Sequence, residues 1–383
     1  MNYRNWSEFW WENITGPNCI LTNITDLLVD HINVVFIVPS DLPWRYDMRL
    51  MLEERIKERN GSMELLVEFI DAEDEYPVEE KAGTFLLNKY AQSPKIRNGF
   101  RDRGELNIQG YLKKNEVLRN RIVWVKGLTG PAAQNWMDFC KGYASAGINT
   151  GIFVLEVHDV GNVTDSSNLK PIGYDENISA NDIQVFNEFI LNDRKRLDGL
   201  WRNYIASVSG CLCDKDAEIS ELLIRTTDFK SESPECGLQR IAERPEYQRR
   251  GGDENSKHIL ALVRRQDEGE IRHRIWTAQV KSLFPLIEFE RNKFIKKHKK
   301  DIENSLRAHC IWQYKEKLEY AEDVELGTLV YIMDIENNGC RVLRISDEES
   351  EKIRLLHKCR NNIAHAKICT PEEVGKIIRY SSS

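Results

Sequence analysis

Four short apolar runs in the first 165 residues constrain the fold more than any other feature of the chain. They span residues 33–38, 65–70, 121–125 and 151–155. Runs this short and this apolar are typical of strands buried on both faces of a parallel sheet. Helical patterns lie between them, as expected of the crossovers that join parallel strands. The sequence therefore predicts an α/β domain with a parallel sheet over residues 1–165.

Beyond residue 178 the strand pattern fades and apolar residues recur at helical spacing. The stretch 230–253 is polar, with two prolines and a Gly-Gly pair, so we expect a loop between domains there. We therefore predict a helical lid-like region with a linker over residues 166–253. An all-α bundle is expected over residues 254–383.

Helix start signals mark this C-terminal bundle. Pro285 interrupts an apolar helical stripe and is expected to kink or restart the helix. Ser346 is placed to cap a helix that runs from Asp347 to about Ala366. Thr370, with Pro371 and two acids behind it, opens a last short helix.

Charge and composition limit the classes of protein to consider. A net charge of −7 excludes a protein that coats nucleic acid through bulk positive charge, although a local basic site stays open. Because no run reaches about 20 apolar residues and no signal-peptide pattern is present, we expect a cytoplasmic protein with no membrane contact. The nine cysteines include no CxxC pair, so we expect reduced thiols, no metal site and no cofactor.

The loop after the first predicted strand lacks the residues that hold nucleotide phosphates. Such a loop needs glycines, a lysine and a hydroxyl, but residues 39–47 contain no glycine or lysine and two prolines. Arg45 is the candidate phosphate contact in this loop. Glu156 is the one acid at the end of a predicted strand. We therefore expect no ATP hydrolysis.

The order of predicted elements resembles the core of the AAA+/STAND-type P-loop ATPases, with residues 170–224 similar to their helical lid. This resemblance implies a degenerate P-loop-like domain without the motifs for hydrolysis. Its expected role is nucleotide sensing or scaffolding.

The most specific pattern in the chain lies on the helix expected after Ser346. At 100° per residue, one sector of this helix is apolar, and Arg360 borders it. Asn361 and His365, four residues apart, share the opposite side and must face solvent or a second surface. The apolar sector consists of Ile353, Leu356, Cys359 and Ile363.

This Arg-Asn-x-x-Ala-His pattern, on a helix in an all-helical region, resembles the HEPN family. The resemblance implies a metal-independent endoribonuclease that acts as a homodimer through the C-terminal bundle, often in antiviral defence with partner proteins of the same operon. RNA cleavage needs a base for the 2′-OH and a cation for the phosphate, roles that suit His365 and Arg360. Asn361 is expected to orient the imidazole or the phosphate. Alternatively, Asn361 bonds His365 merely to fix the helix end.

One dense basic segment supplies candidate RNA contacts without sequence readout. A solvated helix face is the simpler explanation for it, and Glu288 and Glu290 partly neutralise it. The rival to a nuclease is a catalytically inactive scaffold or regulatory subunit of a defence assembly. The candidate RNA-binding residues are Lys293, Lys296, Lys297, Lys299 and Lys300.

Overall fold

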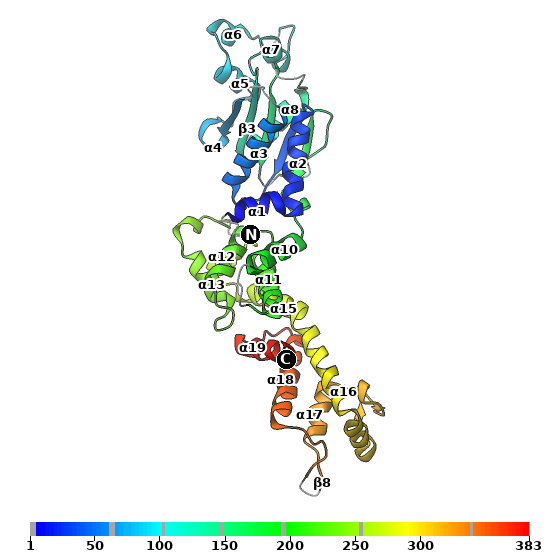
Figure 1. Ribbon diagram of the computed structural model, residues 1–383. Helices are drawn as coiled ribbons and strands as arrows, with labels where there is room; N and C mark the ends of the chain where they lie inside the picture. The colour runs from blue at the N-terminus through cyan, green and yellow to red at the C-terminus, as the bar shows by residue number, and fades with distance from the viewer. Residues whose placement is uncertain are drawn as a thin grey trace. The chain divides into compact units, whose positions relative to one another are not determined.

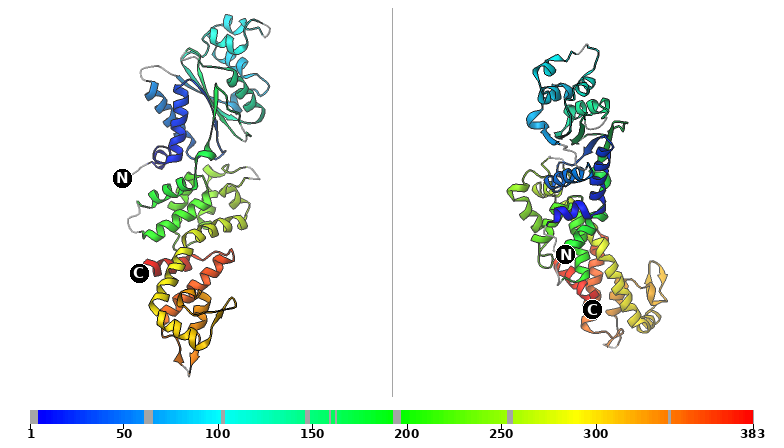
Figure 2. Two further views of the ribbon diagram at one scale, coloured as in Figure 1. Left: turned by 90° about the vertical axis from the view of Figure 1, so that its right-hand side faces the viewer. Right: turned by 45° about the horizontal axis from the view of Figure 1, so that its top comes forward.

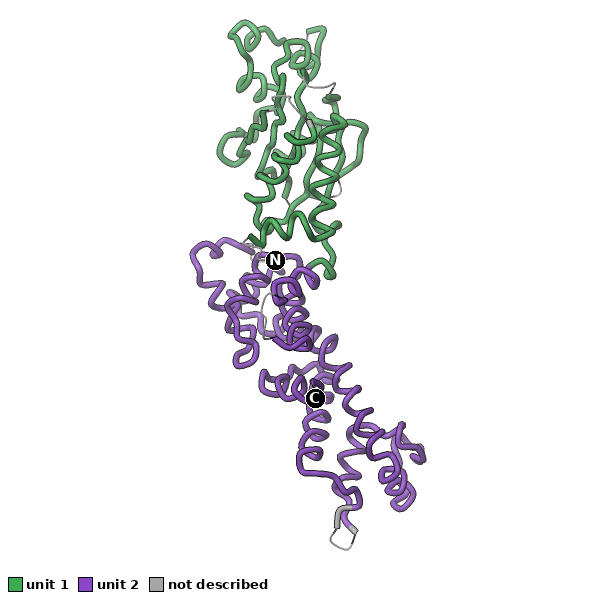
Figure 3. The backbone as a smooth tube through the Cα atoms, viewed as in Figure 1, with its two compact units in different colours: residues 1–182 green, residues 183–383 purple. Residues whose placement is uncertain are grey.

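The chain forms two compact units, residues 1–182 and 183–383, seen in the computed structural model in green and purple (Figure 3). Both units contain helices, and the first also contains the main sheet. The structure describes residues 5–60, 66–101, 104–145, 149–158, 160–161, 163–192, 197–252, 256–337 and 340–382.

The first unit is built on a parallel five-stranded sheet. The strand order is β2-β3-β4-β1-β5, and every neighbouring pair is parallel. The predicted α/β domain with a parallel sheet is therefore confirmed, and each predicted apolar run corresponds to one of the first four strands. The strands are β1 Asn33–Ile37, β2 Leu66–Asp71, β3 Arg121–Leu128, β4 Ile152–Val157 and β5 Leu169–Gly173.

The fifth strand was not predicted. β5 pairs only with β1, so it lies at the edge of the sheet, where Pro171 can be accommodated without an N–H group. The sheet consequently continues past residue 165, where we expected the first domain to end.

Helices cover both faces of this sheet (Figures 1 and 2). Helix α2 (Thr15–Val29) contacts β1 and β5, and α3 (Arg45–Asn60) packs on α2. On the other face, α5 (Ala82–Tyr90) and α8 (Gly130–Gly142) pack over Val123 and Phe153. The remaining helices of the unit are α1 Trp6–Asn13, α4 Ala72–Glu75, α6 Pro94–Gly99, α7 Ile108–Lys114 and α9 Tyr174–Asn177.

Among its described residues, the second unit is helical apart from two short antiparallel strand pairs, β6 with β7 and β8 with β9. Its first half packs α11 on α12 and α15, with α13 between α12 and α14. The prediction of a loop over residues 230–253 was wrong, because Ser233 caps α13 and Leu238 and Ile241 are buried. The elements of this half are α10 Ala180–Asn192, α11 Gly199–Cys213, α12 Ala217–Thr226, α13 Pro234–Ala242, η1 Pro245–Tyr247, α14 Ile259–Arg264 and α15 Glu268–Ser282.

The second half of this unit contains the helices that were predicted from the start signals at Pro285, Ser346 and Thr370. A new helix begins at Phe284, so the predicted restart at Pro285 is confirmed. Helix α18 contacts both α16 and α17. The elements are α16 Phe284–His309, β6 Trp312–Gln313, β7 Glu316–Lys317, η2 Ala321–Asp323, α17 Leu326–Met333, β8 Glu336–Asn337, β9 Cys340–Arg341, α18 Asp347–Ala364 and α19 Pro371–Ser382.

Candidate functional site

Helix α18 begins and ends where its sequence dictates. Ser346 and Glu349 form a reciprocal capping box at its start, as predicted. At its other end the Trp276 indole N–H donates to the carbonyl oxygen of Ile363 at 2.7 Å. The predicted apolar sector is buried throughout, and Leu356 is fully inaccessible to solvent. The opposite side of α18 is thereby held at the protein surface.

Four polar residues lie outside the buried sector of α18 and form what we call the α18 strip: His357, Arg360, Asn361 and His365. His365 is exposed and the other three are half-buried. The Asn361 amide Nδ2 lies 2.9 Å from Nε2 of His357, one turn earlier. Asn361 therefore orients an imidazole, but that of His357 and not that of His365. Burial and the charge of Arg360 lower the pKa of His357, which favours the neutral ring that accepts this bond.

His357 is the residue of this strip that the sequence analysis did not assign. It faces the start of α17, where a Cβ added to Gly327 would lie 3.3 Å from His357 Nε2. The absence of a side chain at Gly327 thus allows α17 to approach the imidazole closely. The signal for His357 was its position four residues before Asn361.

Arg360 is half-buried and only loosely paired. Its guanidinium lies 3.7 Å from a carboxylate oxygen of Glu325, which is beyond a good hydrogen bond. The Glu325 carboxylate also accepts a hydrogen bond from the Tyr314 hydroxyl at 3.0 Å, so Arg360 is not its sole partner. Arg360 therefore keeps most of its donors available to an incoming oxyanion.

His365 lies at the C-cap of α18 with an exposed side chain. Its backbone N–H closes the helix on Asn361, while its imidazole makes no hydrogen bond or ion pair with any described residue. The structure thus places Arg360 and Asn361 side by side in the chain and His365 one turn beyond them.

Three of the five lysines predicted to contact RNA are engaged in ion pairs within the protein. Lys293 pairs with Glu290, a fully buried carboxylate that α18 also holds through Lys352. Lys297 pairs with Glu349 at 2.8 Å and Lys299 with Glu322 at 2.7 Å. Lys296 and Lys300 are exposed and have no ion pair among the described residues. This neutralisation weakens the positive field along α16.

In the first unit, the polar groups near the end of β1 bind one another. Arg45 donates to the carbonyl oxygens of Pro39 and Ser40, at 2.9 and 3.0 Å. A phosphate-binding loop points amide N–H groups at its ligand, whereas two carbonyls of this loop accept from a side chain. The expected role of Arg45 as a phosphate contact stays a prediction.

Glu156, the acid at the end of β4, is completely buried beside this loop. Arg49 on α3 binds its carboxylate with two bonds of 2.7 and 2.5 Å. The Trp124 indole N–H donates a third bond, also of 2.7 Å. The strand-end acid is therefore neutralised and fully hydrogen-bonded.

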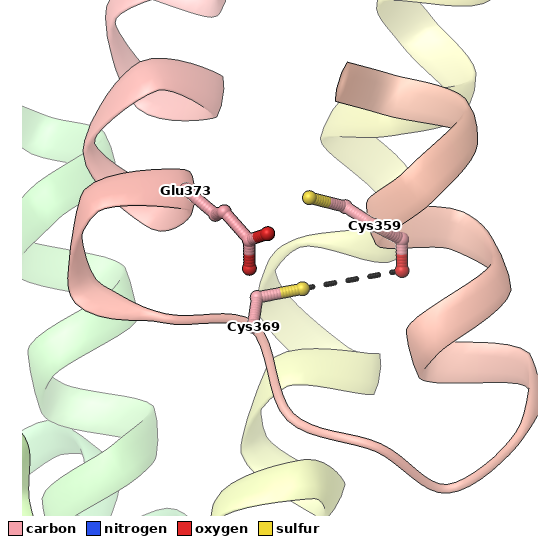
Figure 4. A group of neighbouring side chains, drawn as sticks. All are labelled: Cys359, Cys369 and Glu373. Carbon is pink, nitrogen blue, oxygen red and sulfur yellow. Dashed lines mark hydrogen bonds between the residues drawn. The ribbon is translucent and has the colours of Figure 1, made fainter. Parts of the chain in front are cut away.

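Cys359, Cys369 and Glu373 bring two sulfurs and a carboxylate within 4.8 Å of one another (Figure 4). Glu373 is already paired with Lys358 at 2.7 Å and accepts from the Thr370 N–H at 2.8 Å. The neighbouring thiol and burial raise the pKa of Cys369, which opposes the thiolate that a metal requires. We assign no ion to this cluster, whose groups cap α19 and pack it on α18.

No helix in the described part of the chain is long and apolar enough to cross a bilayer.

No protein-family model and no curated protein matches the chain. Three solved structures are similar to it at 11–12% identity, covering 98–100% of this chain and 73% of theirs. They are Drosophila ORC with Cdc6 bound to poly(dA/dT), AT-rich and GC-rich DNA, with TM-scores of 0.25, 0.25 and 0.23. Scores this low carry no conclusion about fold or function.

Proposed function

We propose that the C-terminal bundle, residues 254–383 of the second unit, is a metal-independent endoribonuclease of the HEPN type. The observation that carries the proposal is the α18 strip: its members Arg360, Asn361 and His365 all lie outside the buried sector of one helix, and His365 is exposed. A purely structural histidine would bond the helix end or the bundle. The His365 imidazole does neither among the described residues.

The chemistry assigned to these residues is intramolecular transesterification. His365 takes the proton of a ribose 2′-OH, and the resulting oxygen attacks the adjacent phosphorus. The bond from phosphorus to the 5′-oxygen breaks, and that oxygen takes up a proton. The products are a 2′,3′-cyclic phosphate and a 5′-hydroxyl. Arg360 stabilises the additional negative charge on the phosphoryl oxygens in the transition state.

The weak contact between Arg360 and Glu325 suits this role. A phosphate that displaces Glu325 gains a bidentate, charge-assisted partner and loses little, because the existing ion pair is 3.7 Å long and partly exposed. Asn361 sets the neutral His357 ring beside this guanidinium. We infer that the active form is a homodimer in which two copies of the α18 strip bind one RNA.

We propose that the first unit is a degenerate AAA+/STAND-like domain that regulates the nuclease without hydrolysing ATP. The parallel sheet with β1 in its interior and helices on both faces supports this proposal. The bonds of Arg45 and Glu156 support the absence of hydrolysis. A cytoplasmic role in prokaryotic antiviral defence, with partner proteins, rests on the family resemblance alone. The alternative is a scaffold in which both units are inactive.

The decisive experiment measures cleavage of labelled single-stranded RNA with excess EDTA. Arg360→Ala and His365→Ala are each expected to reduce the rate by ~100-fold or more, the low end for a lost acid–base group. Arg354→Ala is the matched control, since Arg354 is on the same helix and pairs with Asp334. Its cleavage should stay close to wild type. Cleavage that survives in both test variants, or that requires a metal, would contradict the proposal.

A further inference from the structure

A short hairpin next to Glu325 has an unusual turn. Strands β6 and β7 pair Gln313 with Glu316, so the turn consists of Tyr314 and Lys315 alone. Both residues have positive φ, +50° and +71°. A two-residue turn with positive φ at both positions strongly favours Asn and Gly, because a side chain there meets its own backbone. The residues at this turn are therefore not those that folding prefers.

The same hairpin presents aromatic rings and cations to solvent. Tyr314 is 76% exposed, the highest fraction among the large apolar side chains that stand out from the described surface. Lys315 and Lys317 are also exposed and make no ion pair among the described residues. Trp312, 63% exposed, continues the aromatic surface along β6. Strained backbone positions cluster at functional sites, so this turn is a candidate for one.

Hydrogen bonds hold the hairpin against the start of α17. The Gln313 side chain accepts from the Thr328 hydroxyl at 2.7 Å and from the Glu325 N–H at 3.3 Å. The Tyr314 hydroxyl donates to Glu325 at 3.0 Å, and the same carboxylate lies 3.7 Å from Arg360. The Glu325 carboxylate thus lies between the Tyr314 hydroxyl and the Arg360 guanidinium, which places the Tyr314 ring near the α18 strip.

We propose that the hairpin 312–317 is a stacking site for an unpaired base of single-stranded RNA, with Tyr314 as the stacking ring. The proposal rests on the proposed nuclease function, because Arg360 would hold a phosphate next to the stacked base. Lys315 and Lys317 supply further cations for the backbone of the same strand. Base stacking on aromatic rings tolerates any sequence and requires a single strand, since paired bases hide their faces.

Binding is measured separately from cleavage, with the full chain in EDTA and a fluorescent, uncleavable 2′-O-methyl RNA. Tyr314→Ala should weaken binding about 5- to 150-fold, the range that one stacked base is worth. Tyr314→Phe, which keeps the ring and loses the hydroxyl, should bind much like wild type. Tyr46→Ala is the control, since Tyr46 is a comparably exposed tyrosine in the first unit. A 2-aminopurine base in the RNA should lose fluorescence on binding to wild type and not to Tyr314→Ala.

The double variant Tyr314→Asn/Lys315→Gly separates folding from binding. It restores the preferred turn, so it should unfold at a higher temperature than wild type and bind RNA as weakly as Tyr314→Ala or more weakly. Unchanged affinity in Tyr314→Ala, no RNA binding by wild type, or equal binding of duplex RNA would each overturn the stacking site. Cleavage that still depends on His365 would leave the nuclease standing in that case. RNA binding through Tyr314 without cleavage would refute the nuclease and keep the stacking site.

Discussion

Removing Arg49 should destabilise the first unit strongly, because it leaves the Glu156 carboxylate buried in the sheet with only Trp124 to bind it. The Glu156 side chain is fully inaccessible to solvent and the Arg49 side chain is 15% exposed. Because Glu156 itself has no exposed surface, Arg49→Ala leaves a buried carboxylate that water hydrates poorly.

The size of the effect follows from this burial. Two unit charges about 4 Å apart attract by about 4 kcal/mol at the effective dielectric constant of a protein. Breaking a buried pair by removing one partner costs about 3–5 kcal/mol for the same reason. For a unit of this length, that loss corresponds to a fall in melting temperature of about 6–20 °C. The Arg49→Met/Glu156→Gln double variant removes both charges and should recover much of the loss.

Calorimetry of the full chain measures the melting temperature, and hydrogen exchange assigns the loss to β1 and β4. Peptides covering these strands should exchange faster in Arg49→Ala, while peptides from α18 should not change. A loss below about 1 kcal/mol would mean that the ion pair behaves as a surface pair and that the sheet does not depend on it. A double variant less stable than Arg49→Ala would refute the argument from an unpaired buried charge.

Two further predictions test the other parts of the chain. Leu356→Asp places an unpaired charge at a fully buried position of α18, so it should destabilise the second unit by about 4 kcal/mol or more. Urea unfolding measures this loss. An unchanged free energy of unfolding would mean that Leu356 does not face the core and would refute the register of the helix. The chain should release no phosphate from ATP or GTP with magnesium above a blank, measured colorimetrically, because the loop after β1 lacks phosphate-binding groups; turnover that Arg45→Ala abolishes would refute this.

The parallel sheet could be predicted wherever the strands are buried on both faces. β1, β3 and β4 lie inside the sheet and are mostly buried, so their apolar runs differ sharply from the helices between them. β2 lies at an edge and is partly exposed, but its run of apolar residues, broken by Glu68, still indicated a strand. β5 lies at the edge and contains Lys170 and Pro171, which resemble a loop. The hairpin of β6 and β7 was hidden for a similar reason, since Tyr314 and Lys315 are not turn residues.

The buried and exposed sides of α18 could be predicted from helical spacing alone, because the helix repeat fixes which residues share a face. The partners of its polar residues could not. Glu325 approaches Arg360 only through the packing of α17 on α18, and no local pattern encodes that contact. Helical spacing places both His357 and His365 within reach of Asn361, because each is four residues away. The structure pairs Asn361 with His357, whereas the prediction paired it with His365.

The two units differ in how their polar groups are used, and this difference favours chemistry in the second. Ligands of open parallel sheets bind beyond the carboxyl ends of the strands, where the strand order reverses, which here is beside β1 and β4. There Arg45 binds loop carbonyls, Arg49 binds Glu156 and His158 contacts the carbonyl of Val38. A ligand would have to break bonds that already stabilise the fold. On α18, in contrast, a phosphate displaces only the weak contact of Arg360 with Glu325. Catalysis needs donors that are not already fully bonded in the resting state, and this is why we propose the chemistry for the α18 strip and not for the first unit.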